Sequence, residues 1–190
     1  MTEGMPVKPY TLIEDERATL LMVYTQNGLV RGEVITRSAI RINTWLRTQA
    51  APEYFHLYNT KVVMQGLTGN MQTHSYIEYF IPTHQVIAYH VAPPATEPYD
   101  YDTTEPNRKM EAVVAIIGTF QFKGHIRMAA HSNTSRYLET TREAFLSLYD
   151  IDIINPSLPA MGTIHTPMAL LRLNSISISP LQDKISNPAT

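Results

Sequence analysis

Four arginines and a tryptophan between residues 31 and 47 form the cluster with the clearest chemical potential in this sequence. They are Arg31, Arg37, Arg41, Trp45 and Arg47. Guanidinium groups bind phosphate oxygens and aromatic rings stack on bases, which is how proteins hold single-stranded nucleic acid with little reading of its sequence. The alternative is a solvated rim of charges in which Trp45 closes a hydrophobic core.

Histidine offers the other candidate chemistry. His74, His84 and His90 fall on one predicted hairpin, and three imidazoles can hold a catalytic zinc ion. The second half of the chain has no matching triplet, which favours surface histidines near turns. The sequence has no nucleophile elbow, no phosphate-binding glycine loop and no dinucleotide motif. We therefore expect no catalytic residues, no metal and no cofactor.

Composition limits the class of protein. Hydrophobic residues make up 44% of the 190, which is typical of a globular chain. The absence of cysteine excludes disulfides and cysteine nucleophiles. The N-terminus has no secretion signal pattern, and no apolar run reaches the roughly 20 residues that span a bilayer. The net charge is −2, without the basic excess of an obligate nucleic-acid binder. These features predict a cytoplasmic protein without membrane contact.

An internal repeat predicts how the candidate residues are positioned. Residues 55–62 return as 146–153, 30–34 as 122–126, 45–46 as 137–138, and 80–86 as 170–176. The offset stays between 90 and 92 residues and the order is kept, which predicts two copies of one small domain. A single continuous sheet, or helices at 54–64 and 145–154, would contradict this organisation.

The predicted fold class is mainly all-β: two tandem small antiparallel barrels with short helical turns. The predicted boundaries are an N-terminal arm at 1–19, a first barrel at 20–91, an acidic proline-rich linker at 92–110, a second barrel at 111–179 and a tail at 180–190. Within the arm, residues 11–18 suit either a short helix capped by Thr11 or an irregular lead-in.

Several local features support five strands per copy. Asn27-Gly28 suits a type I′ hairpin turn between strands at 20–25 and 29–36. Asn59 and Asp150 recur at one position, and both residue types tolerate a left-handed bend. Helical turns near 43–47 and 132–140 are expected to bury Trp45 or Leu46, and their counterparts in the second copy, as lids. Pro167 predicts an edge or a bulge in its strand.

This order of elements resembles a duplicated Sm-like barrel, an SH3-type small β-barrel, of a bacterial family. The first Sm motif opens with a glycine and an apolar residue two positions later, as Gly32 with Val34 and Gly124 with Ile126 do. The acidic residue and the asparagine of that motif are replaced. Ser38 and Ile42 stand there in the first copy, and Ala130 and Thr134 in the second.

The second Sm motif has two apolar residues, Arg-Gly, two further residues and then Ile or Val. Residues 80–86 keep the apolar frame and lose Arg-Gly, whereas residues 170–176 keep the arginine, as Arg172, and lose the glycine. The barrel-forming positions therefore persist, while the positions that hold uridine bases in the family are mostly replaced.

The resemblance implies assembly through strand edges, often in rings, more strongly than it implies RNA binding. We expect a non-catalytic interaction or assembly module that pairs with itself or with another protein through exposed strand edges. The alternative is single-stranded RNA or DNA binding through the Arg31–Arg47 rim, with Arg172 as a further contact. The second copy matches only Arg31 of that rim, as Lys123. The rim could equally hold the acidic segment 97–105, in the same chain or in a neighbour.

Overall fold

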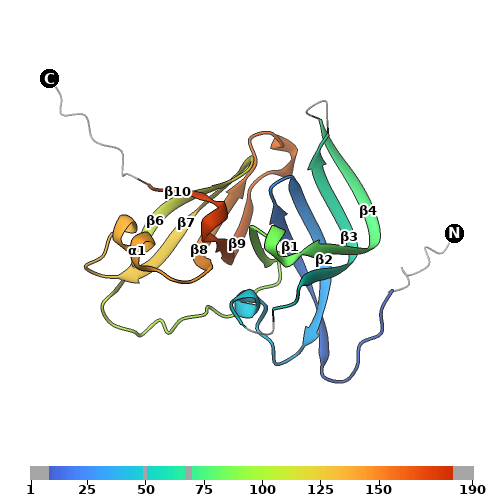
Figure 1. The fold of residues 1–190 in the computed structure, drawn as a ribbon, viewed down its shortest axis with the longest axis horizontal. Coiled ribbons are helices and arrows are strands. Elements are labelled where there is room, and N and C mark those ends of the chain that lie inside the picture. Colours follow the sequence, from blue (N-terminus) through green and yellow to red (C-terminus); the bar gives the residue numbers. More distant parts are fainter. Residues whose placement is uncertain (1–8, 49–50, 67–69, 182–190) are drawn as a thin grey trace.

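The computed structural model describes residues 9–48, 51–66 and 70–181, and within them the chain is mainly β. Ten strands form one antiparallel sheet with a few short helical turns (Figure 1). The elements are β1 (Glu16–Thr25), β2 (Gly28–Arg37), η1 (Ile42–Arg47), β3 (Tyr54–Gln65), β4 (Met71–Pro82), η2 (Thr83–Gln85), β5 (Ala88–Val91), β6 (Arg108–Ile117), β7 (Phe120–Ala129), α1 (Thr134–Thr140), β8 (Phe145–Ile154), η3 (Pro159–Met161), β9 (Ile164–Arg172), η4 (Leu173–Ser175) and β10 (Ser177–Pro180). The expected mainly β fold is confirmed.

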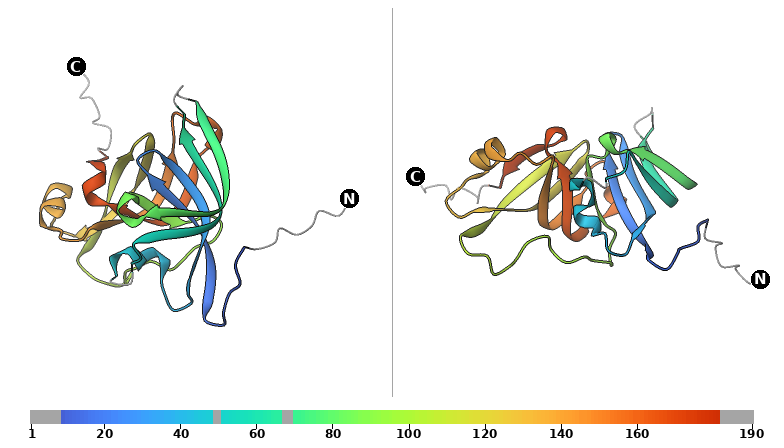
Figure 2. Two further views of the ribbon diagram at one scale, coloured as in Figure 1. Left: turned by 45° about the vertical axis from the view of Figure 1, so that its right-hand side comes forward. Right: turned by 60° about the horizontal axis from the view of Figure 1, so that its bottom comes forward.

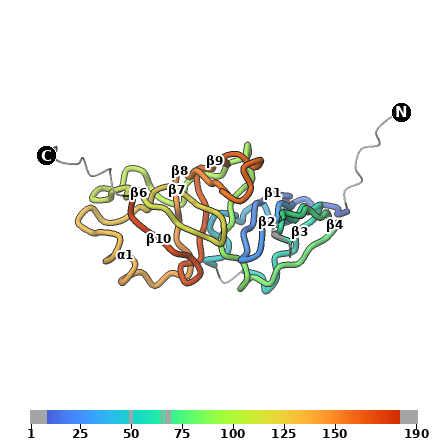
Figure 3. Tube along the Cα trace, turned by 90° about the horizontal axis from the view of Figure 1, so that it is seen from above, coloured from blue at the N-terminus to red at the C-terminus, as the bar shows by residue number. Residues whose placement is uncertain are grey.

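The sheet is continuous and open, which is the outcome named above as contradicting the predicted organisation. The expectation that each copy closes its own barrel is therefore wrong. The strand order is β10-β6-β7-β8-β9-β5-β1-β2-β3-β4. Continuity depends on a short ladder between β5 and β9, in which Ala88 pairs with Leu171 and Tyr89 with Leu170. On either side of that ladder the five strands of each half follow the same order, and the halves lie side by side along the long axis (Figure 3).

Tight hairpins start each half, with one difference from the predicted turn. Thr25 pairs with Gly28, so the first turn consists of Gln26 and Asn27, and neither has a positive φ. Gly28 is needed for another reason, because a Cβ there would lie 2.3 Å from the Val63 carbonyl oxygen. In the second hairpin Gly118 adopts φ +54° at the expected turn.

Left-handed residues occur in β3 and β8 where the repeat predicts bends. Asn59 and Asp150 have φ values of 51° and 48°, which confirms the left-handed bends in β3 and β8. The neighbouring strands β2 and β7 shift register beside these bends, as β-bulges do. Gly32 lies at the first of these shifts, where a Cβ would lie 2.6 Å from Thr60 Cγ2. The bends let both long strands curl over their cores.

Two clusters of buried side chains form the cores, and each takes residues from both halves. The cluster around Phe55 and Tyr89 also contains Phe145 and Leu170 from the second half. The cluster around Phe122 and Leu148 also contains Tyr24 and other residues of the first half. Apolar surface buried across the junction stabilises the two halves against each other.

The helical lids form as predicted, whereas the start of the chain differs. Trp45 and Leu46 in η1 are buried, and Tyr137 in α1 is partly buried against the second core. No helix forms at 11–18, because β1 begins at Glu16, which pairs with Arg37 of β2. The predicted turn at 66–70 falls partly outside the described residues. No helix in the described ranges has the length and apolar character needed to cross a membrane.

Candidate functional site

The acidic linker contacts both halves through a network of hydrogen bonds and ion pairs. Figure 2 shows it running along the outside between the first half and the second. Glu97 begins this contact. Its carboxylate accepts hydrogen bonds from Arg17 Nη2 at 2.5 Å and from the Asn43 backbone N–H at 3.0 Å. The linker therefore binds β1 and η1 of the half that precedes it.

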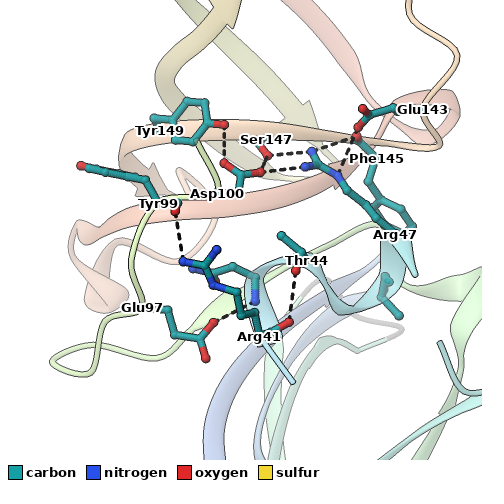
Figure 4. Close-up of polar contacts among 12 residues, drawn as sticks. Arg41, Thr44, Arg47, Glu97, Tyr99, Asp100, Glu143, Phe145, Ser147 and Tyr149 are labelled. Atoms are coloured by element: carbon teal, nitrogen blue, oxygen red, sulfur yellow. Dashed lines mark hydrogen bonds and ion pairs between the residues drawn. The ribbon is translucent and has the colours of Figure 1, made fainter. Parts of the chain in front are cut away.

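Asp100 is the centre of the network (Figure 4). Its carboxylate accepts hydrogen bonds from Arg47 Nη1 at 2.7 Å, Ser147 Oγ at 2.7 Å and the Tyr149 hydroxyl at 2.6 Å. Only 9% of the Asp100 side chain is exposed, so these charge-assisted bonds replace its water. Burial and the bond to Asp100 both raise the pKa of the Tyr149 phenol. Asp100 thus connects η1, the linker and β8.

Two linker tyrosines complete the contact with the second half. The rings of Tyr99 and Tyr101 lie edge-on to Tyr149, with centroids 5.8 Å and 4.9 Å away. The Tyr99 hydroxyl donates to Asp150 at 2.7 Å, which raises its pKa to about 12. The Arg127 guanidinium lies 4.5 Å over the Tyr101 ring. The linker is therefore held against the two halves at Glu97 and at residues 99–101, while residues 93–96 and 102–107 are exposed.

The predicted arginine cluster is dispersed by the fold. Arg31 is exposed on β2, and Arg37 lies at the end of β2 with Asp15 at 3.8 Å. Arg41 donates to the Tyr99 carbonyl oxygen, and Arg47 binds Asp100 (Figure 4). Trp45 is buried, with its ring centroid 5.2 Å from that of Phe55. Two of the four arginines therefore hold the linker. This matches the alternative in which the rim holds the acidic segment 97–105 of its own chain.

Arg172 lies apart from that cluster, in the junction between the halves. Its Nε donates to the Val86 carbonyl oxygen at 2.9 Å, and Nη2 donates to the Thr83 carbonyl oxygen at 2.7 Å. Its backbone N–H donates to Ile87 O, and its guanidinium lies 4.5 Å over the Phe145 ring. Burial lowers its pKa. Arg172 ties β9 to the segment between β4 and β5.

The three histidines of the predicted hairpin do not converge. His90 is fully buried: its Nδ1 lies 2.8 Å from the Val91 carbonyl oxygen, and its Nε2 lies 3.1 Å from the Tyr24 hydroxyl. His74 and His84 are exposed on β4 and η2. Among the residues that the structure describes, no group of three or more His, Asp or Glu side chains gathers as metal ligands do.

The two outermost strands, β4 and β10, form a second candidate site that the sequence did not locate. β4 has 12 residues and lies at one end of the strand order, while β10 has four and lies at the other. Tyr54 and Phe80, on β3 and β4, are 53% and 54% exposed. Their counterparts in the repeat, Phe145 and Leu170, are fully buried in the junction. The sequence repeat could have located this site, because it aligns Tyr54 and Phe80 with the two residues that are buried in the junction.

A groove lies beside β10. It has a volume of about 520 Å³ and an apolar lining with a charged rim, formed by Leu138, Thr141, Arg142, Glu143, Leu173, Asn174, Ile176 and Ile178. In the first half the equivalent space, between η1 and β5, contains side chains of the second half.

Comparison of the chain with protein-family models, with curated proteins and with solved structures gave no match. The arguments for function therefore come from the geometry of the junction, the linker and the two sheet edges.

Proposed function

We propose that this protein is a non-catalytic assembly module of two repeated five-stranded halves, in which β4 of one molecule pairs with β10 of a second copy. One observation carries the proposal: within the chain, the edge of one half already pairs with the edge of the other through β5 and β9. The counterparts of those two strands, β10 and β4, are the two ends of the sheet. Pairing of strand edges needs main-chain hydrogen bonds and few specific side chains.

The backbone N–H and carbonyl groups at the end of β4 point in the same directions as those at the end of β9, its counterpart in the junction. The Thr83 N–H donates to Glu53 O, just as the Leu173 N–H donates to Ala144 O. Because the direction of backbone groups alternates along a strand, Phe80 faces its N–H and carbonyl outward, as Leu170 does. Tyr89 pairs with Val23 as Ile178 pairs with Ala115, so Ile178 is the counterpart of Tyr89. Repeating the register of β5 and β9 would place Phe80 opposite Ile178, and Ile81 opposite Ser177, of the second copy.

Side chains at the two edges are also complementary. In the junction, Phe145 and Leu170 pack into the core that contains Trp45 and Val86. Tyr54 and Phe80 would enter the groove beside β10 in the same way. Full removal of a large apolar side chain from water contributes about 1.5–3 kcal/mol, so burial of these two half-exposed side chains would favour pairing. A long edge strand with exposed aromatic residues is otherwise a liability for aggregation.

The contact between molecules would be weaker than the junction within the chain. Pro82 stands at the position of Arg172 and has neither a backbone N–H nor a guanidinium. The bonds that Arg172 donates to Thr83, Val86 and Ile87 therefore have no counterpart. We infer a reversible assembly with a permanent internal junction.

Sedimentation velocity over a range of protein concentrations tests this function. The wild type should form species larger than a monomer, and Phe80→Lys should shift them toward the monomer. Ile13→Lys is the matched control, because Ile13 is 64% exposed but lies on neither edge strand. A wild-type protein that stays monomeric at the highest concentration, or equal effects of the two substitutions, would contradict the proposal.

A further inference from the structure

Arg47 of the first half contacts the second half across the junction. At the free edge of the sheet, beside β4, the described residues of this chain supply no equivalent arginine contact. Arg47 is the last residue of η1 in the first half, and its Nη2 donates to the Phe145 carbonyl oxygen at 3.1 Å and to Ser147 Oγ at 2.6 Å in the second. It also pairs with the carboxylates of Asp100 and Glu143, at 2.7 Å and 3.3 Å. The guanidinium at the end of η1 in the first half thus binds β8 of the second half.

The equivalent outer face on β3 and β4 is a row of aromatic rings. Tyr54 and His56 are the counterparts of Phe145 and Ser147. The His56 ring lies 4.2 Å from both Tyr58 and Phe80, and Tyr10 continues the row 5.0 Å beyond Tyr58. The equivalent surface of the second half, on β8 and β9, is covered by η1 and the linker. On β3 and β4 of the first half, Phe80 and Tyr54 are more than half exposed.

Carboxylates border this row of rings. Glu78 lies 2.9 Å from His56 Nε2 and keeps 46% of its side chain exposed. Glu33 accepts a hydrogen bond from the Tyr10 hydroxyl at 2.9 Å. Burial, and then the charges of Glu78 and Glu16, raise the pKa of Tyr58. The face is therefore aromatic and acidic, which suits a cation and opposes a phosphate.

The chain itself shows which cation fits such a surface. Arg127 lies 4.5 Å over the Tyr101 ring while it bonds Glu105 at 2.7 Å, and Arg172 lies 4.5 Å over Phe145. A planar guanidinium can stack on a ring and bond a carboxylate together, which an ammonium group does less well. The ring of Tyr54, the counterpart of Phe145, has Pro82 beside it where Phe145 has Arg172.

We propose that Arg142 of a second copy binds the aromatic and acidic face formed by Tyr54, His56, Tyr58, Glu78 and Phe80. This inference rests on the proposed pairing of β4 with β10. Arg142 is exposed two residues beyond the end of α1, the counterpart of η1, and it lines the groove beside β10. Glu139 stands at the repeat position of Arg47, so Arg142 would reach the face from the loop after α1, where it borders the groove beside β10. Its guanidinium stacks on the exposed rings and pairs with Glu78.

A charge exchange between two variants tests this contact. Glu78→Arg alone would place two arginines together, and Arg142→Glu alone would place two glutamates together. Each variant should associate at least about tenfold more weakly than the wild type, as loss of a desolvated ion pair implies. An equimolar mixture should regain association, because every contact between unlike molecules then has one arginine and one glutamate.

Arg136→Glu is the matched control for Arg142→Glu, because Arg136 is exposed on α1 and does not line the groove. Far-ultraviolet circular dichroism checks that each variant folds. If the wild type associates but the mixture is no stronger than either variant, the role of Arg142 is refuted while edge pairing stands. If the wild type does not associate, the proposed function itself fails.

Discussion

Acidification should destabilise this protein through one histidine. Burial of His90 disfavours its charged form and lowers its pKa from 6.5 to about 4. The folded protein therefore binds fewer protons than the unfolded chain between these two values. Stability is fully present above about pH 6.5 and is lost as the pH falls toward 4. At pH 5 the loss of unfolding free energy from this group is about 2 kcal/mol relative to pH 8.

The structure gives the local reason. The Nδ1–H of neutral His90 donates to the Val91 carbonyl oxygen, so its Nε2 accepts from the Tyr24 hydroxyl. A second proton on Nε2 would oppose that phenol donor in a site without solvent. Burial also raises the pKa of Tyr24, so the phenol stays protonated throughout this range. His90 therefore has no buried anion to balance a positive charge.

Urea unfolding followed by Trp45 fluorescence, between pH 8 and pH 5, measures this effect. His90→Gln, which keeps an acceptor for Tyr24, should remove most of the decline even if the variant is less stable at pH 8. His165→Gln should retain it, because 73% of the His165 side chain is exposed. Equal pH dependence in the wild type and His90→Gln would refute the reasoning. Titration of the His90 ring by nuclear magnetic resonance gives an independent check.

Three further predictions concern the linker and the edges. Asp100→Asn should lower the unfolding free energy by about 1–3 kcal/mol in urea, because it weakens charge-assisted bonds to three partners; Asp102→Asn, near the same segment but exposed, should have a much smaller effect. Pro82→Arg should strengthen self-association measured by sedimentation, since it restores a backbone N–H and a guanidinium at the edge. A labelled single-stranded RNA should give no salt-sensitive change in anisotropy, because Arg41 and Arg47 hold the linker; tight, salt-sensitive binding that Arg31→Ala abolishes would instead favour the nucleic-acid alternative.

The local parts of the fold were predictable from the sequence. Asn59 and Asp150 indicated their bends because few residues accept a left-handed backbone, and Trp45 marked its lid by apolar character among polar neighbours. A short helix at residues 11–18 was one of two equally weighted options for the start of the chain. A capping pattern at Thr11 suggested it, but pairing of Glu16 with Arg37 extends β1 instead, since a ladder satisfies more backbone groups than one helical turn.

The continuous sheet was not predictable, and neither was most of the candidate site. The ladder between β5 and β9 has only two residue pairs, and the side chains that stabilise it come from segments 80 or more residues apart. Arg31 and Arg47 are close in the sequence but lie on different elements with different neighbours. The negative charge of the linker suggested a partner for the arginines, while the choice of Asp100 depended on where β8 places Ser147 and Tyr149.

The unlike ends of the sheet restrict how copies can combine. A two-fold dimer joined through a single pair of edges would bring β4 against β4 or β10 against β10, which matches neither the aromatic residues to the groove nor Arg142 to Glu78. Head-to-tail addition always leaves one strand of each kind at the ends of a row, so only a closed circle satisfies every edge. The angle between the halves at the β5–β9 ladder then sets the geometry of each added molecule, and with it whether growth ends in a circle or continues as a fibre.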